Sequence, residues 1–374
     1  MKFRFVVPLI AALVLAACGS AEKPKPAELE PNVVRMGVRN AWVANLGGNV
    51  DFPLQVRALD NLLYVASSDG VVAAMDARTG GDLWRVALGT PLSAGVGSDG
   101  RFTAVVSRSN ELIVLDSSKE IWRQKLASVT YTAPWIENGR IFVLQGNRSV
   151  LALDVTNGKK IWQQNRTGEP LILGRAGVVT AVGDALLVGF NGRLLGMNPA
   201  DGKVLWEAPI ANSRGSNEVE RLVDLVGEMA RPAGQNAAVC VRAFQSGIGC
   251  VDTRKGSLVW MKPSSGATGL DGNEATLYGT ESDGRVRAWR RSDGERLWTN
   301  ENLRLRTLSA PLLVGKAVVV GDNSGLLHFL SGDDGTPLNR LATDGSGIVS
   351  SPVQVGNTVV AVTQRGGVFG FRPE

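Results

Sequence analysis

The stretch Asp76-Ala77-Arg78-Thr79-Gly80-Gly81-Asp82-Leu83-Trp84 decides the fold, because its pattern returns along the chain. A polar or charged residue opens each copy, a Gly follows four positions later, and a Trp stands four positions after the Gly. Further complete copies run from 154 to 162, 198 to 206, 252 to 260 and 290 to 298. A degenerate copy at Asp116 lacks the Gly and ends in Ile121-Trp122, and a last copy, Ser331 to Leu338, has Leu338 in the place of the Trp. Such self-similarity predicts a repeat architecture.

The repeat unit has the size and pattern of a four-stranded blade. The tryptophans at positions 84, 122, 162, 206, 260 and 298 are 38 to 54 residues apart, which is the period of propeller repeats. Within a unit, short apolar runs alternate with turn residues, as in Leu62 to Ala66, then Asp69-Gly70, then Val71 to Met75. This alternation is typical of antiparallel strands joined by tight turns.

The number of units predicts how the ring closes. Seven units are complete, and an eighth is split between the two ends of the folded part. Ala41 to Gly47 matches Leu83 to Gly89, and three strands without such a partner lie between Ser351 and Phe371. Pairing the N-terminal strand with the three C-terminal strands leaves no unpaired edge strand where the ring closes. We therefore predict an all-β fold over 33–374, an eight-bladed β-propeller of four-stranded antiparallel blades.

The first residues predict secretion and a lipid anchor. Basic Lys2 and Arg4 precede an apolar run too short to span a bilayer, which is typical of a signal peptide over 1–17. Cys18 follows small residues, as a lipoprotein signal peptidase requires, so we predict lipidation at Cys18; the alternative is ordinary cleavage beside an incidental cysteine. Gly19 in place of Asp favours the periplasmic side of the outer membrane. Residues 18–32 are rich in Pro, Lys and Glu, which predicts a flexible tether.

The composition argues against catalysis and against nucleic acid. Without Lys2 and Arg4, 38 basic side chains face 35 acidic ones, a net charge of only +3. His328 is the one histidine, and we find no nucleophile elbow, no phosphate-binding loop and no motif for a metal or another cofactor. The repeated Asp, Gly and Trp are interpreted as scaffold residues that form turns and fill the space between blades. We predict a protein that is not an enzyme.

Cys240 and Cys250 flank a predicted hairpin around Gln245-Ser246-Gly247. A cross-strand disulfide is the expectation for an oxidising compartment, and two buried free thiols are the alternative.

Two segments interrupt the repeat and are the candidates for partner binding, since loops on a rigid scaffold are free to vary. One is a charged insert over 212–224, and the other is Glu169-Pro170-Leu171-Ile172-Leu173-Gly174-Arg175. Apolar and Arg side chains on an exposed loop favour a protein contact. The alternative for both segments is a packed connector without a partner.

The chain resembles the BamB family of outer membrane assembly lipoproteins. The resemblance rests on the Cys18 motif, the Lys25 to Leu29 tether, the Trp-ended units and the segment Glu218 to Asp224. It implies a non-catalytic scaffold of the Bam complex that binds the periplasmic domains of BamA and assists the insertion of outer membrane proteins. Unfolded outer membrane proteins are a further implied partner, through strand addition at exposed edges. By resemblance, the residues that contact BamA are Leu171, Leu173, Arg175, Glu220, Arg221 and Asp224.

Two other functions stay open at this point. Similar repeats occur in eight-bladed quinone dehydrogenases, but these enzymes are much longer, and some use adjacent cysteines, whereas Cys240 and Cys250 are ten apart. A propeller that binds a small periplasmic ligand is the other alternative.

Overall fold

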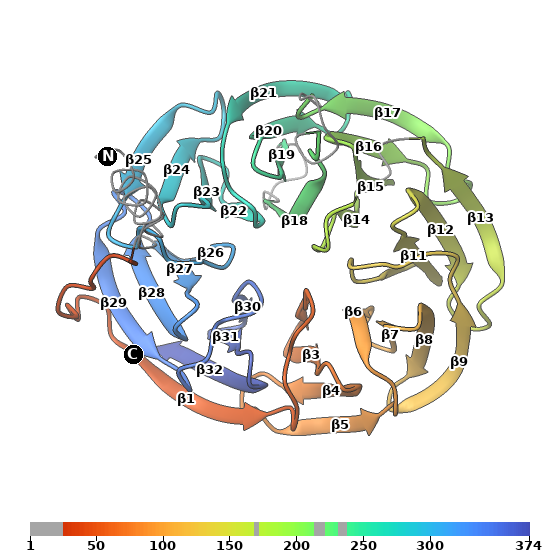
Figure 1. Ribbon diagram of the computed structural model, residues 1–374, viewed down its shortest axis with the longest axis horizontal. Helices are drawn as coiled ribbons and strands as arrows, with labels where there is room; N and C mark the ends of the chain where they lie inside the picture. Colours follow the sequence, from red (N-terminus) through yellow and green to blue (C-terminus); the bar gives the residue numbers. More distant parts are fainter. Residues whose placement is uncertain (1–24, 168–171, 213–220, 231–237) are drawn as a thin grey trace, which may run out of the picture.

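The computed structural model describes residues 25–167, 172–212, 221–230 and 238–374, and every regular element in them is a β-strand. The strands form eight separate four-stranded antiparallel sheets, arranged side by side as blades of one ring around a central axis (Figure 1). The predicted all-β, eight-bladed propeller is therefore confirmed. Among the described residues, no helix is long and apolar enough to cross a membrane.

The blades follow one another in chain order, and in blades 1 to 7 the chain runs from the innermost to the outermost strand. Blades 1 and 2 consist of β2 (Arg57–Leu59), β3 (Leu62–Ala66), β4 (Val71–Asp76), β5 (Asp82–Ala87), β6 (Leu92–Ser98), β7 (Phe102–Ser107), β8 (Glu111–Asp116) and β9 (Lys119–Lys125). Blades 3 and 4 consist of β10 (Trp135–Glu137), β11 (Arg140–Leu144), β12 (Ser149–Asp154), β13 (Lys160–Asn165), β14 (Val179–Val182), β15 (Ala185–Phe190), β16 (Arg193–Met197) and β17 (Val204–Pro209).

The second half of the ring repeats this plan. Blades 5 and 6 consist of β18 (Leu225–Ala230), β19 (Val239–Ala243), β20 (Gly247–Asp252), β21 (Ser257–Pro263), β22 (Leu270–Gly272), β23 (Thr276–Thr280), β24 (Val286–Arg290) and β25 (Arg296–Asn300). Blades 7 and 8 consist of β26 (Leu312–Val314), β27 (Ala317–Gly321), β28 (Leu326–Ser331), β29 (Pro337–Ala342), β30 (Val353–Val355), β31 (Thr358–Val362), β32 (Gly367–Pro373) and β1 (Val38–Asn45).

The two ends of the described chain close the ring as predicted. β1 is the outermost strand of blade 8 and pairs antiparallel with β32, in a register that places Val38 opposite Pro373 and Asn45 opposite Gly367. The pairing gives the C-terminal strands the fourth strand that their own segment lacks. Closure thus holds the first and last parts of the propeller in one sheet.

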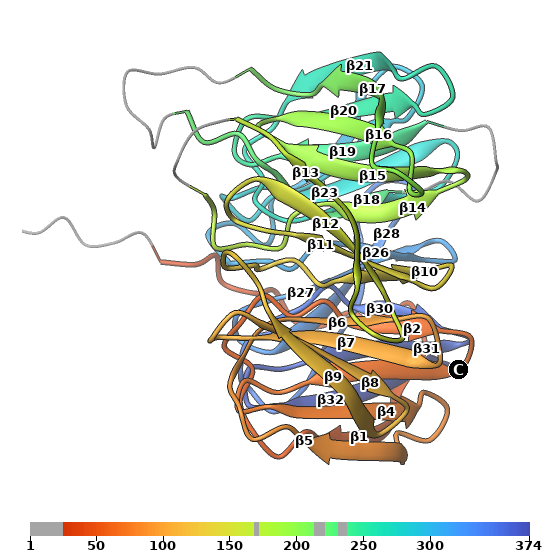
Figure 2. The same ribbon diagram turned by 90° about the vertical axis from the view of Figure 1, so that its right-hand side faces the viewer.

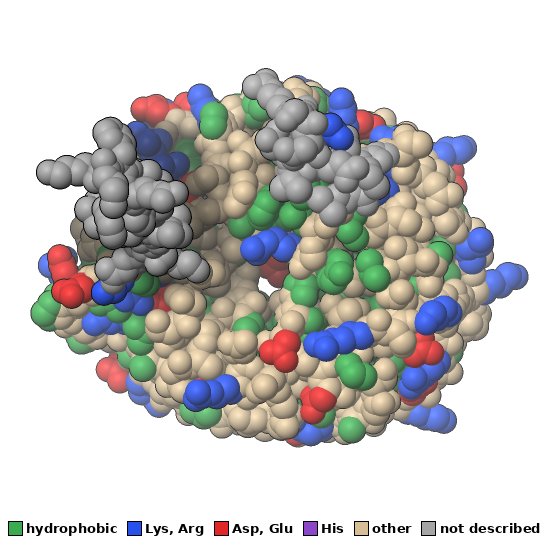
Figure 3. Space-filling view, viewed as in Figure 1, with side chains coloured by type: hydrophobic (Ala, Val, Ile, Leu, Met, Phe, Trp, Pro, Cys, Tyr) green, Lys and Arg blue, Asp and Glu red, His purple; other side chains and the backbone are tan. Residues whose placement is uncertain are grey.

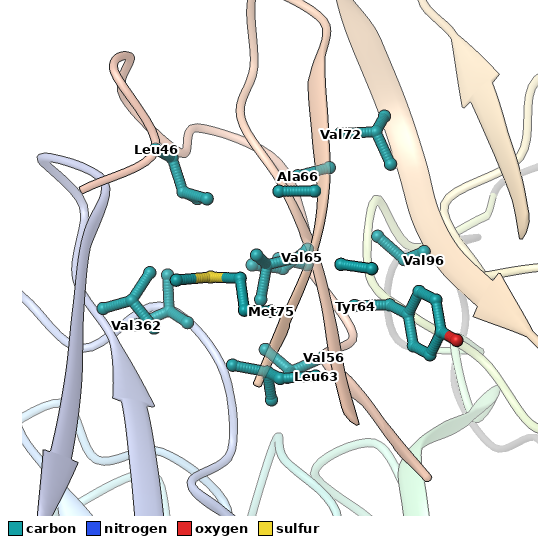
Figure 4. Packing of buried hydrophobic residues seen from close by; sticks show 14 of the residues in the cluster. Leu46, Val56, Leu63, Tyr64, Val65, Ala66, Val72, Met75, Val96 and Val362 are labelled. Atoms are coloured by element: carbon teal, nitrogen blue, oxygen red, sulfur yellow. The ribbon is translucent and has the colours of Figure 1, made fainter. Parts of the chain in front are cut away.

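Burial follows the position of a strand in its blade. Every residue of β7 and β27 is buried, whereas β5 on the rim alternates between exposed and half-buried positions. An inner strand has a neighbouring blade against each of its faces, so apolar residues on both faces are covered. Figure 4 shows such a contact, where Met75 and Val65 of blade 1 meet Val362 of blade 8. The core is therefore a series of layers between blades.

The repeated Trp residues connect neighbouring blades. The indole N–H of Trp42 donates to the carbonyl of Ala77 in the next blade at 3.0 Å, and Trp298 donates likewise to Gly332 at 2.9 Å. Gly80 has φ +73°, and a Cβ there would lie 2.4 Å from the Trp42 ring. The turn therefore needs Gly both for its backbone conformation and for the close approach of the ring. This arrangement supports the interpretation of the motif as scaffold.

The prediction that Leu338 takes the place of the Trp in the last copy of the motif is wrong by one residue. In blade 6, Trp298 pairs with Ala288. The residue of blade 7 equivalent to Ala288 is Phe329, and it pairs with Asn339, while Leu338 lies in the β-bulge. Asn339, and not Leu338, therefore occupies the place of the Trp. The error arises because the sequence offers no aromatic side chain to mark the position.

The loops fall on two faces of the ring. Four antiparallel strands return the chain to the side from which it entered a blade, so all links between successive blades lie on one face, here named the connector face. Among the links on the connector face are 127–134 and 301–311, which the structure describes in full, and 166–178 and 210–224, which it describes in part. Figure 2 shows the ring from its edge, with the C-terminus on the side opposite to where the described chain begins.

The structure joins Cys240 and Cys250 by a disulfide within blade 5. The two residues stand directly opposite each other on β19 and β20, and both side chains are fully buried. The bond links residues ten apart in the sequence, so it restricts a short loop of the unfolded chain.

We expect reduction of the disulfide to lower the free energy of unfolding by about 2–3 kcal/mol, the effect of closing a loop of this length. Urea unfolding with and without dithiothreitol measures the difference. The double variant Cys240→Ala and Cys250→Ala is the matched control, because its stability should not respond to the reductant. Equal stability of oxidised and reduced wild-type protein would contradict the prediction.

Candidate partner-binding site on the connector face

The described residues of the predicted partner site come together although they belong to two different connectors. Leu173 and Arg175 follow β13, Asp224 immediately precedes β18, and all three line one pocket beside Tyr131. Arg221 lies on the same connector as Asp224 and is half-buried. Leu171, Glu220 and the lipidation candidate Cys18 lie outside the described residues.

Asp224 is held by an arginine that sequence reasoning missed. Arg148, in the turn between β11 and β12, donates from Nη1 to the Asp224 Oδ1 at 3.0 Å. The side chains are only 8% and 19% exposed, respectively, so this pair is less screened than a surface ion pair. The contact fixes the end of the 210–224 connector against blade 3. The partners are 76 positions apart, and no pattern in the sequence indicates that they pair.

The connector that carries Leu173 and Arg175 is fixed on both sides. The N–H of Gly177 donates to the Thr132 hydroxyl at 2.8 Å, and the carbonyl of Ala176 accepts from the N–H of Gly227 at 2.8 Å. Leu173 is half-buried and Arg175 is exposed. These two hydrogen bonds, to the segments of Thr132 and Gly227, therefore hold the connector and its side chains at the surface of the ring.

Arg175 lies between the pocket and the ring's central opening. Its guanidinium carbon is 5.6 Å from the centroid of the Phe244 ring, a cation–π arrangement. It also lines the mouth of the central channel together with Glu228. Figure 3 shows this hollow at the centre of the face, with basic and hydrophobic side chains around it. Phe244 is a second residue that the sequence did not single out.

The site has the chemistry of a protein contact. A half-buried leucine, an exposed arginine and a partly exposed carboxylate share the rim of one pocket. Interfaces are rich in such apolar and Arg anchors. Among the described residues, no group of three or more His, Cys, Asp or Glu side chains is placed to hold a metal ion. His328, buried on β28, bonds to Asp322 at 3.0 Å and lies in blade 7, away from this site.

Comparison with known proteins decides the family. A family model described as "Outer membrane protein assembly factor BamB" matches residues 68–300. The protein of that name from Burkholderia pseudomallei is 36% identical over 378 residues, which cover 99% of this chain and 98% of the relative. The chain belongs to the BamB family. The BamB of Bordetella pertussis is 34% identical and covers 99% of this chain and 97% of its own.

The solved structures agree on the fold. The crystal structure of BamB from Moraxella catarrhalis superposes with a TM-score of 0.81 at 23% identity, covering 90% of this chain and 99% of that one. A quinohemoprotein alcohol dehydrogenase from Comamonas testosteroni gives 0.68 at 14% identity, covering 90% of this chain and 76% of that one. At these identities the likeness concerns the propeller alone. The matching family and relatives are named assembly factors, which supports the prediction of a protein that is not an enzyme.

Proposed function

We propose that this chain is a scaffold subunit of the Bam complex that binds the periplasmic domains of BamA through the pocket of Leu173, Arg175 and Asp224. The observation that carries the proposal is their convergence on one pocket from two connectors. The names of the BamB relatives support a role in the assembly of outer membrane proteins. We further propose that lipidated Cys18 holds the ring at the periplasmic side of the outer membrane.

The residues have separate roles in this contact. Leu173 supplies the apolar anchor, which an incoming side chain covers and removes from water. Arg175 is exposed beside the Phe244 ring and can pair with a carboxylate of the partner. Asp224 keeps its place through Arg148, and its remaining lone pairs can accept from a partner's N–H groups. The scaffold orients a partner domain and takes no part in covalent chemistry.

A binding experiment on the protein without residues 1–18 tests the proposal. We expect wild type to be retained by the immobilised periplasmic region of BamA, and Leu173→Ala or Arg175→Ala to bind roughly thirtyfold more weakly, the effect of a hot spot of about 2 kcal/mol. Arg101→Ala is the matched control, since the Arg101 side chain is 70% exposed and pairs with Asp116 in blade 2. Equal binding by all variants would place the interface elsewhere, and no binding by wild type would refute the function.

A further inference from the structure

Residues 27–36 follow a defined path along the rim at blades 6 and 7. The N–H of Ala27 donates to the carbonyl of Arg304 at 2.9 Å, and Arg306 donates back to the carbonyl of Ala27 at 3.2 Å. Leu29 packs against the apolar cluster between these blades, which includes Trp298. Most of this segment belongs to the stretch that composition assigns to a flexible tether, yet here it is docked on the ring.

The same segment fills a gap in the repeat. Blade 8 is built from the two chain ends, so its third strand β32 and its fourth strand β1 are not joined by the hairpin turn that meets the preceding blade elsewhere. Blade 7 in turn has Asn339 in place of the Trp. Asn339 donates to the carbonyl of Met36 at 2.8 Å and accepts from the amide of Asn32 at 3.1 Å. The N–H of Arg35 donates to the carbonyl of Leu338 at 2.8 Å. Residues 27–36 are named the clasp below.

The clasp limits how the ring can be placed at a membrane. If Cys18 carries the lipid, as proposed above, the nine steps from Cys18 to Ala27 span at most about 30 Å. A domain of this length is roughly 50 Å across. The rim at blades 6 and 7 is therefore the part of the ring held closest to the anchor.

The rim beside the clasp displays exposed apolar side chains. Val33, Val34 and Leu305 are 40%, 70% and 43% exposed, and they lie on the clasp and on the connector to which it binds. Leu305 has φ +62°, a conformation that a leucine rarely adopts. Its N–H donates to the carbonyl of Asp283 at 2.7 Å, which helps to hold the loop that displays it.

The charges beside these residues are of both signs. Exposed Arg35 and Arg304 are accompanied by Glu28, Glu30 and Glu301, a mixture suited to zwitterionic headgroups rather than to a strongly anionic surface. Figure 3 shows basic, acidic and hydrophobic side chains gathered at the left edge of this face. An apolar centre with mixed charges at the point of anchoring fits a lipid interface.

We propose that the clasp and the 301–306 loop form a lipid-facing surface, in which Val34 and Leu305 contact the membrane to which Cys18 anchors the chain. The inference rests on the proposed anchoring and adds an orientation to it. The connector face, with the pocket of Leu173, Arg175 and Asp224, then has a fixed relation to the membrane.

Site-specific quenching tests this surface in the lipidated full-length protein. The variants Leu305→Cys and Ile161→Cys are labelled with an environment-sensitive dye and reconstituted in vesicles of phosphatidylethanolamine and phosphatidylglycerol that carry nitroxide-labelled lipid. Both native residues are 43% exposed, and β13 with Ile161 lies across the ring from β29 (Figure 1). We expect a blue shift and loss of emission at 305, with neither change at 161. Equal quenching at both positions, or none at 305, would overturn the proposal.

Two further measurements separate the parts of the argument. The variant Ala27→Pro with Asn32→Ala removes three hydrogen bonds of the clasp, those to Arg304, Asn339 and Arg340. Quenching at 305 should then fall while the circular dichroism of the ring is kept. Unchanged quenching would show that the clasp does not orient the ring. Flotation of the protein with the vesicles tests the lipid anchor by itself. The binding experiment with BamA uses protein without an anchor. A failure of the anchoring and a failure of the BamA contact can therefore each be distinguished from a failure of the lipid-facing surface.

Discussion

Glu281→Gln is expected to lower the free energy of unfolding by about 3–5 kcal/mol, because it leaves a buried guanidinium without its counter-charge. Arg242 of blade 5 and Glu281 of blade 6 lie 3.8 Å apart, and both side chains are fully buried. Burial lowers the pKa of Arg242 to about 10, so the arginine is still charged at neutral pH. The substitution removes the charge that compensates it.

The surroundings of Glu281 increase the expected cost. One carboxylate oxygen accepts from the Ser264 hydroxyl at 2.8 Å, and the other accepts from the N–H and the hydroxyl of Ser265 at 2.5 and 2.7 Å. Arg287 approaches the same carboxylate at 3.7 Å. An amide cannot accept with both of its ends, so Gln loses hydrogen bonds as well as charge.

Urea unfolding followed by circular dichroism measures the effect, and Glu295→Gln is the matched control. Glu295 pairs with Arg290 on the surface, where its side chain is 63% exposed, so its loss should change stability by less than about 1 kcal/mol. The double variant Arg242→Met with Glu281→Leu should recover part of the loss, because it also removes the buried charge of Arg242. A Glu281→Gln protein as stable as the Glu295→Gln control would refute the argument.

The blades could be predicted because their information is local. A turn that requires Gly and a Trp four positions later mark five of the units within nine residues each, as at Gly80 and Trp84. The split eighth blade followed from the likeness of 41–47 to 83–89. Where the Trp is absent, as at Asn339, the predicted position of its replacement was wrong by one residue.

Contacts between blades could not be predicted, because they join residues far apart in the sequence. Arg148 reaches Asp224 across 76 positions, and Asn32 reaches Asn339 across 307. Neither pair has a pattern of its own, since each depends on how the closed ring brings distant segments of the chain together. The clasp was missed for a related reason: its polar composition predicts a tether, and only the gap left by the missing Trp and hairpin at blades 7 and 8 gives it a docking place.

Trp298→Ala is expected to lower the free energy of unfolding by about 3–5 kcal/mol, the usual cost of deleting a buried Trp. Trp298 is 9% exposed, its ring centroid lies 5.9 Å from that of Tyr278, and a Cβ on Gly335 of the next blade would lie 2.6 Å from its ring. Its truncation therefore opens a cavity between blades 6 and 7, which the rigid hairpin of blade 7 cannot fill.

Two comparisons separate this packing from the loss of an aromatic ring in general. Trp298→Phe keeps most of the volume but loses the hydrogen bond to Gly332, so it should cost clearly less than Trp298→Ala. Trp135 is the matched control, because it is only half-buried and lines the central channel beneath Arg57, 4.4 Å away. Trp135→Ala should destabilise the ring by less than Trp298→Ala in urea unfolding followed by circular dichroism. If the two alanine variants lost the same stability, the repeated Trp would be one apolar residue among many, and the joining of blades would have to lie in the turns alone.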